Sequence, residues 1–559
     1  MQNRKTKIVC SIGPVSSEDE VMRGLILAGM NVARLNFSHG SHEEHRARIE
    51  CIRRISGELG ICVAIMLDTK GPEIRTGLVE NDGKVTINAG DRVIVATDDC
   101  LTVPAQSGKA ARLSVTWKEA ASMLKSGHHI LIADGLLDLE VIDIDTAEGA
   151  INCRAANTAV IGSKKNVNLI GVHPRLPIMS EQDKKDIAFG AEMDLDFIAA
   201  SFLSFPYEVT EIRNYLDSLN SHMKIIAKIE SGEGLENIKE IASLADGVMV
   251  ARGDLGVQLP IEQIPLAQKH IISVCRKIGK PVITATQMLE SMIVNPRPTR
   301  AELTDVANAV FDGTDAVMLS GETAAGAYPV EAVKTMDKIA LTVEQSSDFL
   351  ARMKKIRGEC LSWDHNPGDN LGIIMSRSGV EIASEVKAKA IVTPTLTGNT
   401  ARMLSVFRPD EPILALTPDK HAERFMQLYW GVRVCYAPRV DKSESLIQKV
   451  IKAALDTGTA GISDKIMLVA GLPLESPNMV NTVRVLILGT VLARSGAGGY
   501  ARAGLTRRQG RIVHAERAEE ARKKITPPGA AGGDILVCKT LTEDYLPVIP
   551  LVNGVICKG

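Results

Sequence analysis

Short apolar runs that end in polar residues recur through the N-terminal part of the chain, and amphipathic segments separate most of them. The intervening segments include 17–28, 41–59, 261–278 and 299–311. Runs this apolar indicate strands buried on both faces of a parallel sheet. Eight strand-then-helix units predict an α/β fold, a (β/α)8 TIM barrel with its active site at the strand ends. An open doubly wound sheet is the alternative. The eight runs are 7–11, 32–38, 62–70, 197–201, 225–230, 248–254, 282–287 and 316–322.

The pattern changes between residues 71 and 171, a gap too long for a simple crossover. Short runs of alternating apolar and polar residues are separated there by Gly, Asp and Asn turns. This alternation predicts an all-β domain inserted after the third barrel strand. We therefore expect the barrel to comprise 1–71 and 171–342, and the insertion to comprise 72–170. The clearest strands of the insertion are 84–87, 91–96, 129–132 and 139–144.

A second α/β block follows the barrel at 343–490, and a long helix at 340–356 is expected to lead into it. Its predicted strands are 372–375, 390–392, 413–416, 432–435 and 465–469. A stretch rich in Gly and Arg, 494–511, then leads to a short C-terminal domain at 491–559. That domain shows one clear strand, 534–538.

Length and composition restrict the class of protein. A chain of 559 residues exceeds a single core and should form three or four domains. Charged residues make up 24% and the net charge is −2, which gives no electrostatic case for nucleic acid. No apolar run approaches the roughly 20 residues that span a bilayer, and the N-terminus lacks an apolar signal region. We expect a cytoplasmic protein whose ten scattered cysteines are reduced.

Charged residues stand at the ends of two neighbouring apolar runs. Lys228 and Glu230 close the run at 224–229, and Gly253 and Asp254 follow the run at 247–250. The carboxyl ends of parallel strands meet on one face of a barrel. Two carboxylates and a lysine there suit a hard divalent cation beside an anionic substrate. A salt-bridge network in the barrel rim is the alternative.

A hydroxyl-rich loop at 393–401, with the sequence TPTLTGNTA, runs from a predicted strand into a predicted helix. Hydroxyls and free N–H groups at a helix N-terminus form a cradle for phosphate. Capping by Ser or Thr without any ligand gives the same pattern, so the loop alone leaves both readings open.

Six strings in the chain resemble the pyruvate kinase family, and the match runs in order over about residues 1–490. Its members transfer a phosphoryl group from phosphoenolpyruvate to ADP, which gives ATP and pyruvate in the last step of glycolysis. The resemblance implies this activity, an inserted lid over the nucleotide and a C-terminal effector domain. The strings are LNFSHG (35–40), LDTKGPEIR (67–75), KIE (228–230), ARGDLG (251–256), ATQMLESM (285–292) and LSGET (319–323).

The resemblance assigns catalytic roles to residues at the strand ends. Glu230 and Asp254 would bind Mg²⁺ (or Mn²⁺), and Lys228 would stabilise the phosphoryl group in flight and the developing enolate. Thr286 would orient a proton relay for the enolate, because its hydroxyl has no useful pKa; capping of the next turn is its alternative role. The remaining substrate contacts would come from Arg34, Ser201, Ser320 and the N–H groups of Gly253 and Asp254.

The resemblance also implies a monovalent cation site and a nucleotide site. Hard oxygen donors for K⁺ would come from Asn36, Ser38, Asp68 and Thr69. Glu73 in the family string goes with K⁺ dependence, which we therefore expect. His39, Arg75 and Lys165 would contact ADP or ATP at the mouth between barrel and insertion. A solvated basic rim is the alternative for these three residues.

Regulation and assembly are implied in the same way. Thr395, Thr397 and Thr400 align with the loop that binds an effector phosphate in the family. We expect activation by a phosphorylated small molecule, which the sequence does not identify. The segment 472–478 lacks the Trp and basic residues used for fructose bisphosphate. The family is usually a homotetramer. The tail from about Gly496 resembles the extra phosphohistidine-type domain of some bacterial members, and the chain ends before the histidine segment of that domain.

Three rival functions make different demands on the sequence. A phosphoenolpyruvate-utilising synthase or dikinase needs a phosphorylatable histidine and a nucleotide-grasp domain, and neither is visible. A non-catalytic sensor predicts loss of Lys228, Glu230, Asp254 or Thr286, and all four are present. A metal-dependent aldolase would need neither the K⁺ residues nor the inserted lid.

Overall fold

The structure is a computed structural model of the chain, and it divides into two compact units. The first runs to Leu488 and the second starts at Gly489. The residues that it describes are 4–80, 83–106, 109–133, 135–146, 148–172, 174, 176–359, 371–440, 442–471, 480–488, 511–525 and 534–557. Within these ranges, none of the helices combines the length and the apolar character that crossing a bilayer requires.

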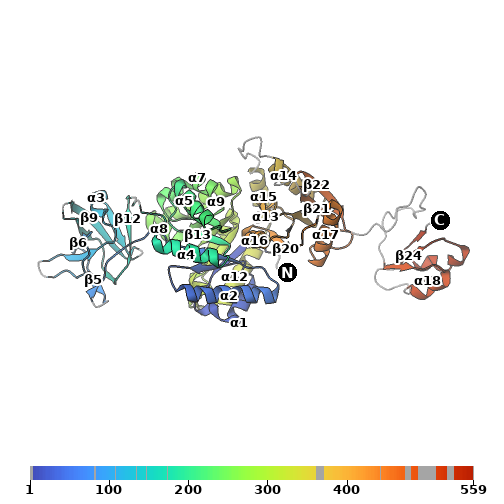
Figure 1. Ribbon diagram of the computed structural model, residues 1–559, viewed down its shortest axis with the longest axis horizontal. Helices are drawn as coiled ribbons and strands as arrows, with labels where there is room; N and C mark the ends of the chain where they lie inside the picture. Colours follow the sequence, from blue (N-terminus) through green and yellow to red (C-terminus); the bar gives the residue numbers. More distant parts are fainter. Residues whose placement is uncertain are drawn as a thin grey trace. The chain divides into compact units, whose positions relative to one another are not determined.

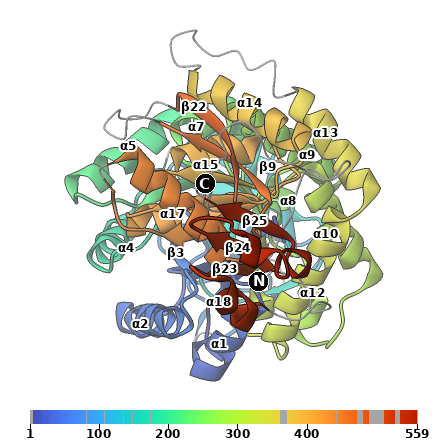
Figure 2. The ribbon, with the colours of Figure 1, turned by 90° about the vertical axis from the view of Figure 1, so that its right-hand side faces the viewer.

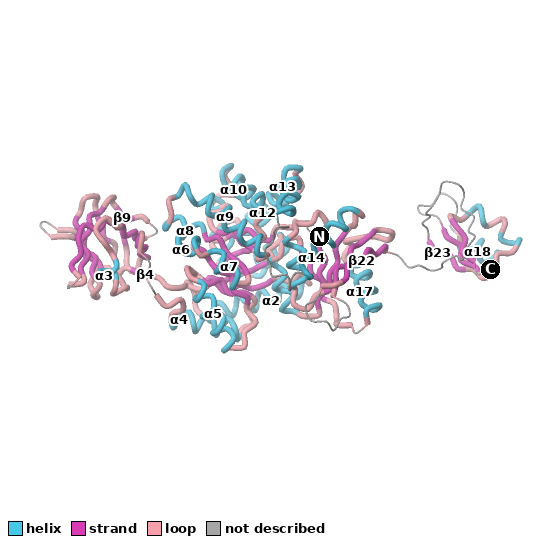
Figure 3. The backbone as a smooth tube through the Cα atoms, turned by 90° about the horizontal axis from the view of Figure 1, so that it is seen from above, coloured by secondary structure: helices cyan, strands magenta, loops and turns pink. Residues whose placement is uncertain are grey.

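A closed barrel of parallel strands forms the centre of the first unit, in the order β1-β17-β16-β15-β14-β13-β3-β2 (Figure 3). The predicted barrel is therefore confirmed, and the open sheet is excluded. Each of the eight predicted runs overlaps one of its strands, and six contain the whole strand. The strands are β1 (Lys7–Ser11), β2 (Val32–Asn36), β3 (Ala64–Asp68), β13 (Phe197–Ala200), β14 (Lys224–Ile229), β15 (Gly247–Ala251), β16 (Val282–Ala285) and β17 (Ala316–Leu319).

Helices follow the strands and surround the barrel (Figure 2). Ser41, Ser180 and Thr299 each close a capping box at the start of a long helix, which fixes where that helix begins. The helices are α1 (Asp19–Ala28), α2 (His42–Leu59), α4 (Glu181–Glu192), α5 (Pro206–Ser218), α6 (Gly232–Glu236), α7 (Ile238–Leu244), α8 (Arg252–Gln258), α9 (Ile264–Ile278), α10 (Arg300–Asp312), α11 (Gly321–Ala324) and α12 (Pro329–Glu344), with short turns η1 (Val15–Ser17), η3 (Ile261–Gln263) and η4 (Glu290–Ile293).

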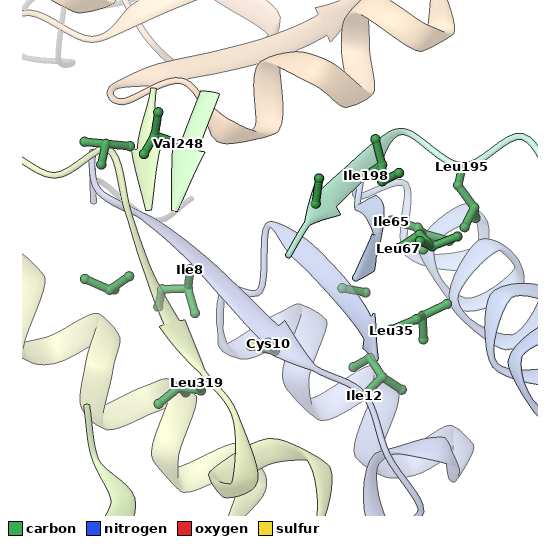
Figure 4. Close-up of a cluster of buried hydrophobic side chains, with 14 of the residues drawn as sticks. Ile8, Cys10, Ile12, Leu35, Ile65, Leu67, Leu195, Ile198, Val248 and Leu319 are labelled. Atoms are coloured by element: carbon green, nitrogen blue, oxygen red, sulfur yellow. The ribbon is translucent and has the colours of Figure 1, made fainter. Parts of the chain in front are cut away.

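Side chains alternate between two cores along each barrel strand. Outward-facing residues such as Ile8, Ile65 and Ile198 pack in one buried cluster with residues of the surrounding helices (Figure 4). Inward-facing residues form a second cluster, which includes Phe425 and Leu428 from the C-terminal part of this unit. These two residues complete the inner core of the barrel.

The insertion forms a seven-stranded sheet, in the order β4-β12-β8-β9-β10-β6-β7, and a two-stranded sheet of β11 and β5 (Figure 1). The short helix α3 (Ala120–Met123) departs from the predicted all-β character, because one turn is too short to show a helical period. The strands are β4 (Ile74–Arg75), β5 (Val85–Ile87), β6 (Arg92–Ala96), β7 (Ala111–Ser114), β8 (His129–Ile132), β9 (Leu137–Asp145), β10 (Ala150–Ala155), β11 (Ala159–Ile161) and β12 (Asn166–Ile170).

The block after the barrel contains a five-stranded sheet in the order β20-β19-β18-β21-β22, of which β22 alone is antiparallel to its neighbour. The sheet confirms the predicted α/β character of this block. The elements are α13 (Ser347–Glu359), α14 (Leu371–Glu385), β18 (Ala390–Pro394), α15 (Asn399–Val406), β19 (Ile413–Thr417), α16 (Lys420–Phe425), η6 (Met426–Leu428), β20 (Val432–Tyr436), α17 (Ser443–Asp456), β21 (Lys465–Ala470) and β22 (Thr482–Ile487).

Two predictions for this block were wrong. The helix expected at 340–356 is two helices, because Ser346 interrupts it and accepts a hydrogen bond from the Phe349 N–H at 3.2 Å, as a cap does. The strand expected at 372–375 lies inside α14, where Ser376, Gly379, Val380 and Ala383 are buried with helical spacing. The continuous apolar run at the start of α14 masks the helical spacing of these buried residues in the sequence.

The second unit has a parallel sheet of β23 (Arg511–His514), β24 (Asp534–Cys538) and β25 (Gly554–Cys557). It also contains α18 (Ala518–Lys524) and the turns η7 (Glu543–Tyr545) and η8 (Ile549–Leu551). Only β24 was predicted. The segment 472–478, which bears on the effector prediction, lies outside the described residues.

Candidate active site

The polar mouth of the barrel follows from the alternation of side chains along its strands. Val9, Met66, Ile226 and Met318 face inward and belong to the apolar inner core. Two positions further along the same strands, inward-facing residues are polar. At the C-terminal ends of the strands, or directly after them, these are Ser11, Arg34, Asp68, Ser201, Lys228, Glu230 and Ser320.

Lys228 lies at the centre of this group and is 8% exposed. Its Nζ is 2.7 Å from Ser201 Oγ, 3.1 Å from Asp68 Oδ1 and 2.9 Å from Glu230 Oε1. Burial opposes the charge of Lys228, but the two carboxylates outweigh burial and raise its pKa above the ordinary value. Lys228 is therefore a fixed, permanently protonated cation.

Glu230 is held on both oxygens and is 1% exposed. Oε1 pairs with Lys228, and Oε2 accepts a hydrogen bond from the Phe202 N–H at 2.6 Å. Burial, opposed by Lys228 and reinforced by the charge of Asp254, raises the pKa of Glu230 to about 7. A cation would relieve this repulsion between Glu230 and Asp254, so the pair fits a divalent metal ion.

Asp68 joins two cations across the barrel mouth. Its Oδ2 accepts from Arg34 Nε at 2.5 Å, its Oδ1 pairs with Lys228, and Arg34 Nη1 donates to Ser11 Oγ at 2.7 Å. Burial disfavours the Asp68 carboxylate, yet Arg34 and Lys228 together lower its pKa. The predicted phosphate-binding Arg34 is thus oriented by β1 and β3.

Thr286 follows β16 in a left-handed conformation, with a φ of 64°, which is costly for a β-branched residue. Its Oγ1 donates to the Ala285 carbonyl at 2.7 Å and accepts from the Gly253 N–H at 2.9 Å. Arg252 holds the turn, because Nη2 donates to the Thr286 carbonyl at 2.6 Å and Nε donates to the Ala285 carbonyl at 3.1 Å. Gly253, expected to bind a substrate carboxylate, thus has Thr286 as its partner here.

Ser320 follows β17 and precedes α11. Its N–H donates to Glu322 Oε2 at 2.7 Å, and Glu322 Oε1 accepts from the Leu289 N–H at 3.0 Å. The Ser320 hydroxyl is buried and has no hydrogen-bond partner within the described ranges.

The predicted K⁺ residues lie on two adjacent strand ends. Asn36 and Asp68 are register partners in the β2–β3 pair. Asn36 Oδ1 accepts from the Ser38 N–H at 3.0 Å, and the Thr69 carbonyl accepts from Ser201 Oγ at 2.6 Å. The donors are hard oxygens, and Arg34 and Lys228 already compensate the one carboxylate. This set fits a monovalent cation better than a divalent one.

The predicted nucleotide residues are only partly brought together. Arg75 and Asn166 are partners in the β4–β12 pair, which places Lys165 beside Arg75. Arg75 is tied to Glu73, with Nη2 to Oε2 at 2.6 Å, and Nη1 donates to the Lys164 carbonyl at 2.8 Å. His39 is exposed on the loop after β2, and no contact joins it to Arg75 or Lys165 among the described residues.

A cavity of about 140 Å³ lies between the barrel mouth and the insertion. Asp254 and Ser231 line it from the barrel, and Glu73 and Asn168 line it from the inserted segment. Gln258 Nε2 on α8 donates to Asn168 Oδ1 on β12 at 3.2 Å. The insertion thus contacts the helix that carries Asp254.

Two hydroxyls of the loop at 393–401, those of Thr395 and Thr397, have partners within the loop itself. Thr395 Oγ1 accepts from the Gly398 N–H at 3.0 Å, and Thr397 Oγ1 accepts from the Asn399 N–H at 3.4 Å. Gly398 has a φ of 81° and precedes α15, and Thr400 lies in the first turn of this helix. Thr395 and Thr397 thus satisfy N–H groups at the start of α15, although Gly398, which precedes the helix, has no side chain to cap it.

Sequence reasoning missed three residues that orient the site: Ser11, Arg252 and Glu322. Arg252 and Glu322 stand inside strings that we had compared with the family, so their position was visible but their contacts were not. Ser11 is the last residue of β1, and its inward position follows from alternation with Val9. Alternation along the strand was the signal available for it.

Comparison with known proteins gives a consistent result. A family model described as "Pyruvate kinase, barrel domain" matches residues 3–333, and "Pyruvate kinase, alpha/beta domain" matches residues 374–486. A pyruvate kinase from Geobacillus stearothermophilus is 44% identical over 99% of this chain and 91% of its own length. One from Staphylococcus aureus is 41% identical over the same shares. A solved pyruvate kinase from Cryptosporidium parvum superposes with a TM-score of 0.82 at 39% identity, over 87% of this chain and 97% of that one.

Fold and site together define a (β/α)8-barrel phosphotransferase with a lysine held between carboxylates at its mouth. Both family models and the near-complete relatives agree on one family within this class. The chain belongs to the pyruvate kinase family.

Proposed function

We propose that this chain transfers a phosphoryl group from phosphoenolpyruvate to ADP, with Mg²⁺ and K⁺ as cofactors, in the cytoplasm and as a homotetramer. The observation that carries the catalytic part is Lys228, a protonated amine fixed between Asp68, Ser201 and Glu230. Phosphoryl transfer is catalysed mainly by positioning and charge neutralisation. The assembly rests on the sequence resemblance.

Arg34 and Lys228 supply the positive charge for the phosphoryl group. Arg34 presents a planar donor that Asp68 and Ser11 orient, which suits a phosphate. Lys228 would lie beside the enolate oxygen as charge develops on it. Neither cation needs to reorganise during the reaction, since both are held by buried partners.

Thr286 would handle the proton that converts enolpyruvate into pyruvate. Its hydroxyl already exchanges hydrogen bonds with Gly253 and Ala285, which fixes the oxygen position. A bound substrate carboxylate would take over the Gly253 N–H, and the Thr286 oxygen would then be free to accept from water.

Glu230 and Asp254 would hold Mg²⁺, which would supply positive charge to stabilise the negative charge of the substrate. No three His, Cys, Asp or Glu side chains of the described ranges form a metal site alone. The remaining ligands would come from substrate and water, as Mg²⁺ prefers. Asn36, Ser38, Asp68 and Thr69 would hold K⁺.

His39, Arg75 and Lys165 would contact the nucleotide, and the insertion would close over it and exclude water. A phosphorylated effector would bind at Thr395, Thr397 and Thr400. In support, the loop precedes a helix N-terminus, and each threonine hydroxyl that accepts from the loop still has its own proton to donate.

The test is pyruvate formation from phosphoenolpyruvate and ADP with Mg²⁺, comparing K⁺ with tetramethylammonium at equal ionic strength. We expect activity that rises strongly with K⁺. Activity indifferent to K⁺ would keep the phosphotransferase and remove the cation site with Glu73. Folded protein without activity under either condition would favour the sensor.

A further inference from the structure

His45 is a buried imidazole on α2 that the proposed mechanism does not use. It is 1% exposed, and its ring stacks on Phe37 with centroids 4.0 Å apart and planes at 13°. Phe37 stands between Asn36 and Ser38, in the loop that follows β2. His45 therefore packs directly against the loop to which we assigned the K⁺ and nucleotide contacts.

A hydrogen bond also fixes the orientation of the His45 ring. His45 Nε2 lies 3.0 Å from the carbonyl oxygen of His39. A carbonyl only accepts, so Nε2 carries the proton and Nδ1 is a bare lone pair. Nδ1 is buried and has no partner within the described residues. Burial also lowers the pKa of His45, while the bond to His39 opposes that shift. The ring is a neutral donor of fixed orientation.

The rest of the loop is fixed to the same turn of α2. Ser41 and Glu44 form a capping box, with Ser41 N to Glu44 Oε2 at 3.1 Å. Gly40 has a φ of 87°, which would strain any residue with a side chain, and a Cβ there would lie 2.7 Å from Glu44 Oε2 of the capping box. Since both ends of the segment after Phe37 are anchored on α2, His45 determines where its middle lies.

We propose that His45 is a positioning residue for the loop that carries Asn36, Ser38 and His39. The stack on Phe37 fixes how far the loop lies from α2, and the Nε2–H bond fixes the direction of the His39 carbonyl. This inference rests on the proposed roles of those three residues. Loss of the donor should weaken ADP and K⁺ binding, and leave phosphoenolpyruvate binding near Lys228 unchanged.

Two substitutions separate ring from donor. His45→Phe keeps a ring against Phe37 and removes the donor, whereas His45→Gln keeps an N–H near the Nε2 position and removes the ring. His42→Phe is the control, because His42 lies on the same helix, stacks on Phe189 at 4.5 Å and pairs with Asp186. Thermal unfolding and circular dichroism establish that each variant is folded.

For His45→Phe we expect the KM for ADP and the K⁺ concentration for half-activation to rise about tenfold, as for one lost hydrogen bond. The KM for phosphoenolpyruvate should change less than about twofold. His45→Gln should recover part of both losses, and His42→Phe should match the wild type. If the wild type needs no K⁺, the cation proposal fails, and the KM for ADP still tests His45. Unchanged constants in folded His45→Phe, or equal losses for ADP and phosphoenolpyruvate, would overturn the positioning role.

Discussion

The Gly253 N–H donates a hydrogen bond of 2.9 Å to the hydroxyl oxygen of Thr286. This bond joins the helix that follows β15 to the end of β16, and it occupies a donor that the sequence had assigned to the substrate. Arg252, the residue before Gly253, holds the backbone of the same turn from outside. A substrate carboxylate bound at the Gly253 N–H, as we propose, would therefore have to displace this internal contact.

Thr286→Val removes the hydroxyl and keeps the shape of the side chain. We expect kcat to fall by about 10²-fold or more, the scale of a lost proton-transfer group. Thr286→Ser keeps the hydroxyl and should retain most of the activity. Exchange of pyruvate methyl protons with deuterated water, followed by NMR, isolates the proton step. Normal exchange in Thr286→Val would contradict the proton role.

Lys228→Met removes the buried cation and leaves Asp68 and Glu230 without their shared partner. We expect kcat for pyruvate formation to fall by about 10²- to 10³-fold or more, as when one fixed donor to developing charge is lost. Lys224→Met is the matched control at the other end of β14, where the lysine is 39% exposed. Comparable losses in both variants would point to damage of the strand rather than to lost electrostatic catalysis.

Lys7 supplies a prediction for pH. It is buried under the barrel, its Nζ donates to the Val432 carbonyl at 2.6 Å, and burial, aided by Arg4 and Arg433, lowers its pKa from 10.5 to about 7. Between these two values Lys7 is protonated in the unfolded chain and neutral in the folded one. The unfolded state therefore binds one more proton, and the free energy of unfolding rises with pH from about 7 toward 10.

Lys7→Met should abolish that contribution. We expect the urea midpoint of the wild type to gain on that of Lys7→Met from pH 7 to 9.5. The corresponding gain in the free energy of unfolding should be at most about 1.4 kcal/mol per pH unit, the limit for one proton. Parallel midpoint curves for the two proteins would show that Lys7 is charged in the folded state.

Arg408 ties the C-terminal block to the barrel. Its Nη1 donates to Asp315 Oδ1 at 2.7 Å and its Nη2 to the Gly313 carbonyl at 2.9 Å, and both side chains of the ion pair are buried. Arg408→Met leaves Asp315 uncompensated and should cost about 3–5 kcal/mol of stability. Arg112→Met, which breaks an exposed pair with Asp98, should cost under about 1 kcal/mol. Similar costs in urea unfolding would contradict this difference.

The sequence predicted the barrel well because its strands are apolar, regularly spaced and closed by polar residues. The same logic brought Lys228 and Glu230 together, since both end one strand. The prediction failed where the local sequence pattern and the tertiary packing favour different elements. Ser346 caps a helix within a continuous amphipathic pattern, and the run at 372–375 is as apolar as a strand but packs as a helix. Side-chain partners such as Ser201 for Lys228 depend on register between distant strands, which no local pattern encodes.

Phe425 and Leu428 lie in the inner core of the barrel although two strands of the next sheet, β18 and β19, and several helices separate them from its last strand, β17. During synthesis, the barrel therefore exposes an open apolar floor until these residues have emerged. An isolated barrel cut before α16 would retain that opening and should bind chaperones or aggregate. Completion of the barrel core thus waits for the C-terminal α/β block, which couples the two parts during biogenesis.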